Sequence, residues 1–509
     1  MKNILFFPIN TFWPSHFETD LELILSEIDK GNKIYFLFCN KDLKICDNNL
    51  LSDKKICNKC INIRKRSLEL IFLNRNEKIN IISLKKCVNE FHKINNISNQ
   101  KINFNNVDDL KQIVYNSFDI GYGIASSFAI ELDEASSIDE YKEKINNLYT
   151  EAILFYKCIK SIISDYSIST GYIFNGRFCF SRAFIQAFID KNVTFYTHER
   201  GSTYKKYEIF KNTFPHNIIN YTNRVNNLWN SNDDLFIKKV IADSFFNKRF
   251  IGEDTDFRSF TKEQNIFQLP NEINNYQKIV TIYTSSNFEF DYVNNEYTYK
   301  FYKSQIDGIR QIINSLKNDS NIGIFLREHP NQKNRNSNFR EQLKQLYAQN
   351  FHYISAESDV SSYKLLLKSN IVITFNSTMG IEATYWGIPS ILCSNAIYEN
   401  FNIAYKPSTH DEVINLIKSD LKPISKDDVL KYGYYHSLFG INFQYYRPAD
   451  IWHGYFFYVD LHNISINNKH YLRHFLKKYK NMMKYFIRKY FPSLFIFLKK
   501  LKAKQIKNK

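Results

Sequence analysis

The chain has 509 residues, of which 44% are hydrophobic and 23% charged, a composition typical of a globular protein with two to four domains. Glycine (14) and proline (10) are scarce, whereas Phe (44) and Tyr (35) are abundant, which excludes a largely disordered chain. The net charge is +17, but thirteen Lys and Arg and no acidic residue lie in 470–509, so about +4 belongs to the first 469 residues. Because the charge is confined to the tail, we expect no nucleic-acid partner.

Eight cysteines in a chain of this length are not the pattern of a disulfide framework. The apolar run 4–9 is too short for a secretory signal, and no run reaches the roughly 18 apolar residues of a spanning helix. These features predict a cytoplasmic protein.

The first half alternates apolar strands with segments of helical periodicity. Strands are predicted at 2–9 and 33–39 around a helix at 18–30, followed by a loop-rich insertion at about 40–105. A long helix is predicted over 137–166, and then a strand–helix–strand unit over 171–175, 180–190 and 193–199.

A polar stretch at 252–276 reads as a linker, and the alternation restarts beyond it. Its predicted elements are strands at 278–285, 322–329, 351–355, 371–375 and 390–393, with helices at 302–317, 338–348, 360–368 and 377–386. Repeated strand–helix alternation predicts an α/β fold with two Rossmann-like domains that face a central cleft. The predicted division is an N-terminal domain over 1–265, a C-terminal domain over 270–450 and a helical tail over 451–509.

One segment with candidate chemistry lies after the strand 371–375. Asn376 ends this strand and a helix follows, whose first turn offers free backbone N–H groups together with the hydroxyls of Ser377 and Thr378. Such a helix start suits a phosphate. Gly380 would let a ligand approach closely, and Glu382 would accept hydrogen bonds from a ribose. An ordinary Ser/Thr-capped helix is the alternative.

A second segment ends the strand 322–329 with Arg327 and His329, and Pro330 terminates it. Both side chains can contact a phosphate, and His329 could donate a proton to a leaving phosphate. Because both segments follow strands of the same predicted sheet, we expect them to meet at one crevice.

In these two segments the sequence resembles the capsular polysaccharide synthesis family, which includes bacterial Kdo transferases, and more loosely the bacterial sialyltransferases. The resemblance implies a two-Rossmann-domain (GT-B) glycosyltransferase whose His-Pro motif and Ser/Thr-rich helix start bind the nucleotide of a CMP-sugar. By this resemblance, the residues that would bind the donor are His329, Pro330, Ser377, Thr378 and Glu382. Where Kdo transferases often have a Gln-x-Pro-x-Asp-like segment, this chain has the sequence 283–291, with Ser285 and Ser286 as candidate phosphate contacts.

The first domain supplies the candidate catalytic and acceptor residues. Transfer to a hydroxyl needs a carboxylate or histidine near the acceptor, and Glu199, His198 and His16 are the candidates, with Glu199 favoured beside Arg200 and Gly201. A structural ion pair between Glu199 and Arg200 is the alternative. The acceptor side of the cleft is predicted to contain Glu18, Asn175, Arg177 and Arg200.

Two further features were weighed for binding. The spacing of Cys57 and Cys60, with Cys39 and Cys46, would permit a structural zinc site, although one C-x-x-C is weak evidence; no other metal or cofactor is expected. The tail 470–509 mixes apolar and basic residues at helical spacing, and either packs on the core or binds an anionic membrane surface.

Together these observations predict a glycosyltransferase, peripheral on the inner face of the cytoplasmic membrane. It would transfer a sugar from a nucleotide donor, with CMP-sugar favoured, to a lipid-linked or polysaccharide acceptor of capsule or lipopolysaccharide. The alternatives are a CDP-glycerol-type glycerophosphotransferase, a UDP-sugar epimerase, and a membrane-bound binding protein of GT-B shape without catalysis.

Overall fold

The computed structural model describes residues 1–76, 79–85, 87–89, 101–231, 234–253, 259–265, 267–286 and 290–463. Met1–Gly454 form one compact unit and Tyr455–Lys509 a second. Within the described residues, no helix combines the length and the apolar character needed to cross a bilayer.

The first sheet has the strand order β12-β6-β5-β4-β1-β2-β3. Its first five strands along the chain are parallel, while β6 and β12 are antiparallel additions at one edge. The strands are β1 (Asn3–Phe6), β2 (Lys33–Phe38), β3 (Asn80–Ser83), β4 (Thr170–Phe174), β5 (Thr194–Arg200), β6 (Lys206–Lys211) and β12 (Ile441–Asn442).

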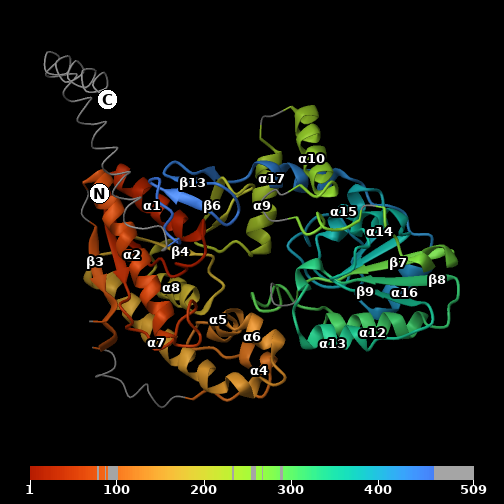
Figure 1. Ribbon diagram of the computed structural model, residues 1–509, viewed down its shortest axis with the longest axis horizontal. Helices are drawn as coiled ribbons and strands as arrows, with labels where there is room; N and C mark the ends of the chain where they lie inside the picture. The colour runs from red at the N-terminus through yellow and green to blue at the C-terminus, as the bar shows by residue number, and fades with distance from the viewer. Residues whose placement is uncertain are drawn as a thin grey trace, which may run out of the picture. The chain divides into compact units, whose positions relative to one another are not determined.

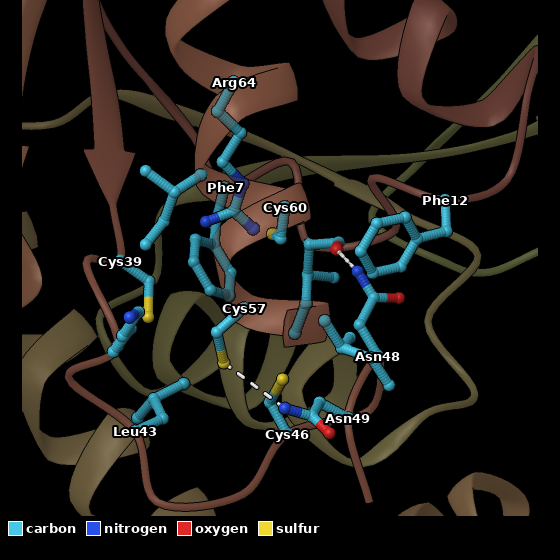
Figure 2. A pocket seen from close by; sticks show the side chains of 14 residues that line it. Phe7, Phe12, Cys39, Leu43, Cys46, Asn48, Asn49, Cys57, Cys60 and Arg64 are labelled. Atoms are coloured by element: carbon cyan, nitrogen blue, oxygen red, sulfur yellow. Dashed lines mark hydrogen bonds between the residues drawn. The ribbon is translucent and has the colours of Figure 1, made fainter. Parts of the chain in front are cut away.

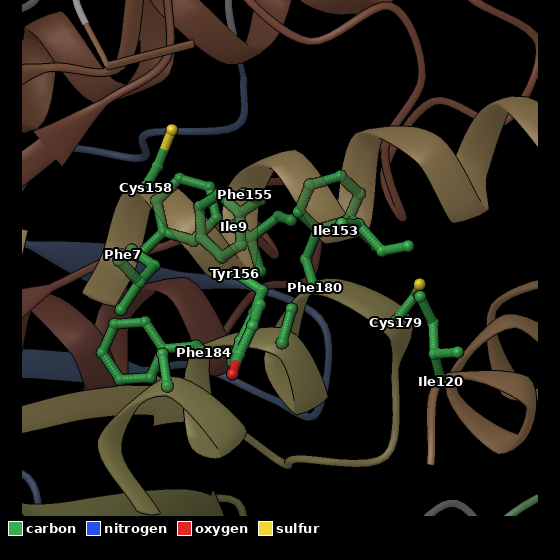
Figure 3. Close-up of a cluster of buried hydrophobic side chains, with 14 of the residues drawn as sticks. Phe7, Ile9, Ile120, Ile153, Phe155, Tyr156, Cys158, Cys179, Phe180 and Phe184 are labelled. Atoms are coloured by element: carbon green, nitrogen blue, oxygen red, sulfur yellow. The ribbon is translucent and has the colours of Figure 1, made fainter. Parts of the chain in front are cut away.

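Helices cover the first sheet on both faces, which explains why its central strands are continuous apolar runs. They are α1 (His16–Asp29), α2 (Lys54–Arg75), α4 (Val107–Lys111), α5 (Ile120–Ser127), α6 (Ala129–Glu134), η2 (Ile138–Tyr141), α7 (Lys142–Asp165) and α8 (Cys179–Asp190). Figure 3 shows the core between β1 and the helices α7 and α8, where Phe7 contacts Phe155 at a ring-centroid distance of 4.7 Å. Burial of each such side chain contributes roughly 1.5–3 kcal/mol.

The second sheet is entirely parallel, with the order β11-β10-β7-β8-β9. Figure 1 shows α12 and α13 on one face of this sheet and α14 and α15 on the other. The strands are β7 (Lys278–Tyr283), β8 (Ile322–Arg327), β9 (Phe351–Ile354), β10 (Ile371–Thr374) and β11 (Ser390–Leu392). The helices are η3 (Asn271–Asn275), α12 (Gln305–Leu316), η4 (Pro330–Gln332), α13 (Asn338–Lys344), α14 (Ser362–Lys368), α15 (Met379–Tyr385) and α16 (His410–Lys418).

The two sheets share one strand order, since each places its first strand beside its fourth. This reversal of the winding direction occurs between β1 and β4 in the first sheet and between β7 and β10 in the second. Ligands of doubly wound sheets bind outside the carboxyl ends of the strands at this point. The predicted α/β fold with two Rossmann-like sheets is confirmed.

The insertion at 40–105 is not as loop-rich as predicted. It contains the 22-residue helix α2 and the strand β3, which pairs in parallel with β2. The prediction missed α2 because its buried face includes Arg64 and Ser67 among the apolar residues, which interrupts the apolar periodicity.

The predicted division into consecutive domains is also too simple. The helices α9 (Ile218–Trp229) and α10 (Leu235–Phe250) pack with α15 and α17 (Asp427–Leu438) in one hydrophobic cluster, although they precede the predicted linker. In the other direction, β12 joins the first sheet. The short strands β13 (Tyr446–Pro448) and β14 (Gly454–Phe456) follow, and the tail helix predicted for 470–509 lies outside the described residues.

Candidate functional site

A cavity of about 800 Å3 opens between the carboxyl ends of the two parallel sheets. This volume falls within the roughly 300–1,000 Å3 range of small-molecule sites. One wall comes from the loops after β1, β4 and β5, and the other from the loops after β7, β8 and β10. Helices α9, α10 and α17 contribute the residues between these walls. The cavity therefore lies where the winding of both sheets reverses.

Glu199 is the central acidic group of the first wall. Its Oε2 accepts a hydrogen bond from Asn175 Nδ2 at 2.6 Å, and its Oε1 accepts one from the Arg200 backbone N–H at 3.0 Å. Its side chain is 23% exposed and lines the cavity. The turn that presents Asn175 includes Gly176 at φ +99°, a conformation that favours glycine. Glu199 is thus held in place with one face toward the cavity.

His16 lies beside Glu199 at the start of α1. Its Nδ1 is 3.5 Å from Glu199 Oε1, and its ring lines the cavity. Burial, followed by the charge of Arg200, lowers the pKa of His16 well below its usual value. The imidazole is therefore neutral near pH 7.

Two predicted residues of this wall are buried away from the cavity. His198 is fully buried, and its Nε2 lies 2.8 Å from Asp20 Oδ1. His198 points into the interior toward Asp20 and does not line the cavity, whereas Glu199 and Arg200 at the end of β5 do. Glu18 accepts a hydrogen bond from the Ser15 N–H at 2.8 Å and completes the capping box of α1. The catalytic prediction for His198 and the acceptor prediction for Glu18 are wrong.

The predicted arginines of the first wall do line the cavity. The Arg177 guanidinium lies 4.8 Å from the centre of the Phe178 ring. Arg200 lies 5.3 Å from the centre of the Trp452 ring, and its Nε is 3.3 Å from Ser15 Oγ. Cations and aromatic faces therefore alternate along this wall. Trp452 also shows that the first residues of the predicted tail belong to the cavity.

On the second wall, His329 and Pro330 line the cavity as predicted. The Asn331 backbone N–H donates to His329 Nδ1 at 3.2 Å, so in the neutral ring the proton resides on Nε2. Burial lowers the pKa of His329 to about 4, which keeps the ring neutral at physiological pH. The His329 backbone N–H donates to Thr284 Oγ1 at 3.0 Å and fixes the turn.

Ser377 and Thr378 line the same wall. The helix α15 begins two residues later than predicted, at Met379, whose N–H donates to Ser377 Oγ at 3.3 Å. The His-Pro turn and the Ser-Thr turn thus share one cavity, as the sequence predicted.

Three residues that were predicted to contact the donor lie behind the cavity wall instead. Asn376, Ser285 and Ser286 are buried and do not line the cavity. Ser285 N–H donates to Gln305 Oε1 at 2.9 Å, and Ser286 Oγ donates to Asn331 Oδ1 at 2.8 Å. The strand β7 ends at Tyr283, two residues earlier than predicted, so that Thr284 rather than the serines reaches the cavity.

Gly380 and Glu382 were also predicted to touch the donor. A Cβ atom at Gly380 would lie 2.8 Å from Thr374 Oγ1 and from Tyr398 Oη, so the glycine serves helix–sheet packing. Glu382 is buried and accepts hydrogen bonds from Arg249 Nε at 3.0 Å and from Tyr363. Both predictions of direct contact are wrong, because these residues lie on the inner side of α15.

Arg327 lines the cavity but is almost fully buried. Its guanidinium donates to the backbone carbonyls of Ser355 and Ser358 and to Ser362 Oγ. These hydrogen bonds join β8 to the loop before α14. Arg327 therefore stabilises the loop next to β8, a role that its position at a strand end did not predict.

The sequence also missed cavity residues supplied by α9, α10 and α17. Arg249, Tyr221 and His436 all line the cavity, and Tyr221 Oη is 2.9 Å from His436 Nε2. None of these residues follows a strand end or belongs to a motif, so no local signal marks them.

The four cysteines considered for zinc lie around a separate cavity of about 30 Å3 (Figure 2). Cys57 accepts a hydrogen bond from Asn49 Nδ2 at 3.3 Å, and Cys60 Sγ lies 3.2 Å from Thr11 Oγ1. Burial raises the pKa of the Cys46 and Cys39 thiols, which disfavours the thiolates that zinc requires. No cluster of three or more His, Cys, Asp or Glu in the described part of the chain has the geometry of a metal site.

Comparison with solved structures gives distant similarities. The chain is 11% identical to the β-Kdo 2,4-transferase of Thermosulfurimonas dismutans KpsC, with 53% of this chain and 79% of that chain covered and a TM-score of 0.36. The β-Kdo 2,7-transferase of the same protein gives 11% identity, coverages of 55% and 79% and a TM-score of 0.32. The UDP-GlcNAc 2-epimerase of Neisseria meningitidis is 11% identical, with 85% of this chain and 98% of that chain covered and a TM-score of 0.25.

A search of curated proteins finds no significant match. Residues 295–432, which include the His-Pro and Ser-Thr turns, match the family model described as capsule polysaccharide biosynthesis protein. Over this segment, the resemblance to the capsular polysaccharide synthesis family is confirmed.

Proposed function

We propose that this chain is a glycosyltransferase of capsule polysaccharide synthesis, which transfers a sugar from a nucleotide donor to a growing surface glycan. One observation carries the proposal: a phosphate-compatible wall and a wall with a candidate base face the same cavity. The phosphate-compatible wall contains His329, Ser377 and Thr378, and the wall with the candidate base contains Glu199 and His16.

The donor side is suited to a nucleotide phosphate. The Nε2–H of His329 and the hydroxyls of Ser377 and Thr378 are hydrogen-bond donors at the cavity edge of the second sheet. Donors that are already fixed in position stabilise charge that develops on the leaving phosphate oxygen. A CMP-sugar is the favoured donor because these turns match the family pattern on which the sequence resemblance depends.

The acceptor side supplies a base and a platform for sugar rings. Glu199 accepts the proton of the attacking hydroxyl, whose oxygen forms the new bond to the anomeric carbon. The bond from that carbon to the donor phosphate breaks, and its electron pair leaves with the nucleotide. Aromatic side chains such as Trp13, Phe178 and Trp452 line the same wall and can pack against the apolar faces of sugars.

Thermal-shift measurements against CMP, CDP, UDP and GDP test the donor class. A ligand that binds only the folded state stabilises it by mass action, by about 2.7 kcal/mol at one hundred times its Kd. We expect CMP to raise the Tm. Stabilisation by UDP alone would instead favour a UDP-sugar reaction, and incubation with UDP-GlcNAc would detect epimerisation directly. Because glycerophosphate transfer from CDP-glycerol also releases CMP, CDP-glycerol is tested separately as a donor.

A lipid-linked acceptor implies work at the inner face of the cytoplasmic membrane, and the basic segment 470–509 is the proposed attachment. Thirteen basic residues without an acid favour anionic lipid at about 1 kcal/mol per well-placed cation. Co-sedimentation of the full chain with phosphatidylglycerol vesicles tests this. We expect binding that Lys477→Glu, Lys478→Glu and Lys484→Glu together weaken, and equal binding to neutral phosphatidylcholine vesicles would contradict it.

A further inference from the structure

Helix α10 brings an arginine from the first half of the chain to the wall formed by the second sheet. Arg249 lies in its last turn and lines the cavity together with His329, Ser377 and Thr378. Its side chain is 32% exposed. The segment precedes the linker predicted from the sequence, so the arginine reaches this wall only through the packing of α10.

One face of α10 is fastened to α15. Tyr385 Oη donates to Asp243 Oδ1 at 2.8 Å, and the rings of Phe246 and Tyr385 are stacked with centroids 4.0 Å apart. Asp243, Phe246 and Arg249 are spaced three residues apart, which places them on one side of the helix. The arginine is thus delivered by a rigid element and not by a loop.

Glu382 fixes the orientation of the guanidinium. Its Oε1 accepts from Arg249 Nε at 3.0 Å and lies 2.9 Å from Nη2, so one edge of the guanidinium is held. The other carboxylate oxygen accepts from Tyr363 Oη. The carboxylate is 2% exposed, whereas the arginine reaches the cavity. The buried carboxylate therefore orients a guanidinium that is partly exposed at the cavity.

The other charged groups of this wall are engaged with the protein itself. Arg327 donates to Ser355, Ser358 and Ser362. Glu328 accepts from Arg340 Nε at 2.5 Å and from Tyr353 Oη at 2.6 Å. Glu253, which also lines the cavity, lies 3.6 Å from Lys248 Nζ. Arg327 is almost fully buried, whereas the Arg249 side chain is 32% exposed, so Arg249 is the more accessible of the two guanidinium groups beside the His-Pro and Ser-Thr turns.

We propose that Arg249 binds the donor phosphate and that Glu382, which does not touch the donor, positions Arg249 for this contact. The inference rests on the proposed function, since it assigns a residue to the phosphate of the nucleotide donor. It replaces the direct ribose contact that the sequence predicted for Glu382.

Paired titrations of CMP and cytidine isolate the phosphate contact. The two ligands differ by the phosphate, so a residue that binds it affects CMP alone. Arg249→Ala is expected to weaken CMP by about ten- to a hundredfold, the usual worth of a hydrogen bond to a charged group, and to leave cytidine unchanged. Arg249→Lys should recover part of the loss. Lys248→Ala is the matched control on the same turn and should change neither ligand.

The role of Glu382 is tested by a double-mutant cycle. Glu382→Gln alone should weaken CMP by less than Arg249→Ala, and in the Arg249→Ala background it should have no further effect, because it acts through the arginine. If Arg249→Ala does not fold, Arg249→Lys and Glu382→Gln carry the same comparison.

The outcomes separate this inference from the proposed function. If the unaltered protein binds no nucleotide, the proposed function fails and this assignment with it. If it binds CMP and Arg249→Ala weakens CMP and cytidine equally, or neither, the assignment is overturned while the proposed function stands. Additive effects of the two substitutions would overturn the positioning role of Glu382.

Discussion

Glu199 Oε1 and His16 Nδ1 lie 3.5 Å apart, on the edge of the cavity opposite the His-Pro turn. The carboxylate lies at the end of β5 and the imidazole in the first turn of α1, more than 180 residues apart in the sequence. The fold thus places a neutral imidazole beside the carboxylate that is the candidate base.

Glu199→Gln should remove most of the transferase turnover. The amide keeps the size of the side chain but cannot accept the proton of the acceptor hydroxyl, and loss of a general base costs about 10²- to 10⁴-fold. Steady-state assays with a sugar donor of the nucleotide that the thermal-shift screen selects would measure kcat, and Glu69→Gln on the exposed face of α2 is the control. CMP affinity should be unchanged. Wild-type kcat in Glu199→Gln would exclude this residue as the base.

His329→Ala should weaken CMP by about tenfold, the upper part of the range for one hydrogen bond. Because the pKa of His329 is about 4, the ring is a neutral donor throughout pH 6–8, and its contribution should not fall as pH rises through 6.5. Calorimetric titrations of both proteins across this range cancel the ionisation of CMP itself. A difference between them that vanished above pH 7 would show that a charged imidazole binds the phosphate.

Glu18→Ala should destabilise the protein by about 1 kcal/mol, the usual cost of losing a helix-capping hydrogen bond. Glu18→Gln should retain most of the stability, because an amide oxygen also accepts from the Ser15 N–H. Urea unfolding measures both. If Glu18→Gln instead abolished acceptor use at unchanged stability, the acceptor role predicted from the sequence would return.

Glu151→Gln should stabilise the protein above pH 7. Glu151 is buried, its Oε2 has no hydrogen-bond partner among the residues that the structure describes, and burial raises its pKa to about 7. A raised carboxyl pKa means that the folded state binds more protons than the unfolded state, so stability falls as pH rises from about 4.5 to 7. Because one pKa unit corresponds to about 1.4 kcal/mol, the ionised carboxylate costs the folded protein a few kcal/mol above pH 7.

Chemical unfolding at pH 5 and pH 8 checks this prediction. The gain from Glu151→Gln should be present at pH 8 and mostly absent at pH 5, where the wild-type carboxyl is protonated in the folded protein. If Glu151→Gln stabilised the protein equally at pH 5 and pH 8, the Glu151 carboxyl would not ionise between these pH values, and the prediction would be wrong.

The sequence alone determined the parts of this protein that depend on local order. Apolar strands of about five residues, each followed by a helix, predicted both Rossmann-like sheets, and strand ends marked Glu199, His329 and Ser377 as cavity residues. Parallel strands place all their carboxyl ends at one edge of a sheet, so a polar residue after a strand is informative without coordinates.

Only the tertiary structure decided which other residues line the cavity together with them. His198 of β5 points inward to Asp20, and Glu382 lies on the inner side of α15, where it holds Arg249. Packing of α10 on α15 brought in Arg249, although the linker predicted at 252–276 had assigned it to the other domain. Which of these side chains reach the cavity depends on how helices far apart in the sequence pack together. Local periodicity carries no information about such contacts, because it relates only residues of the same element.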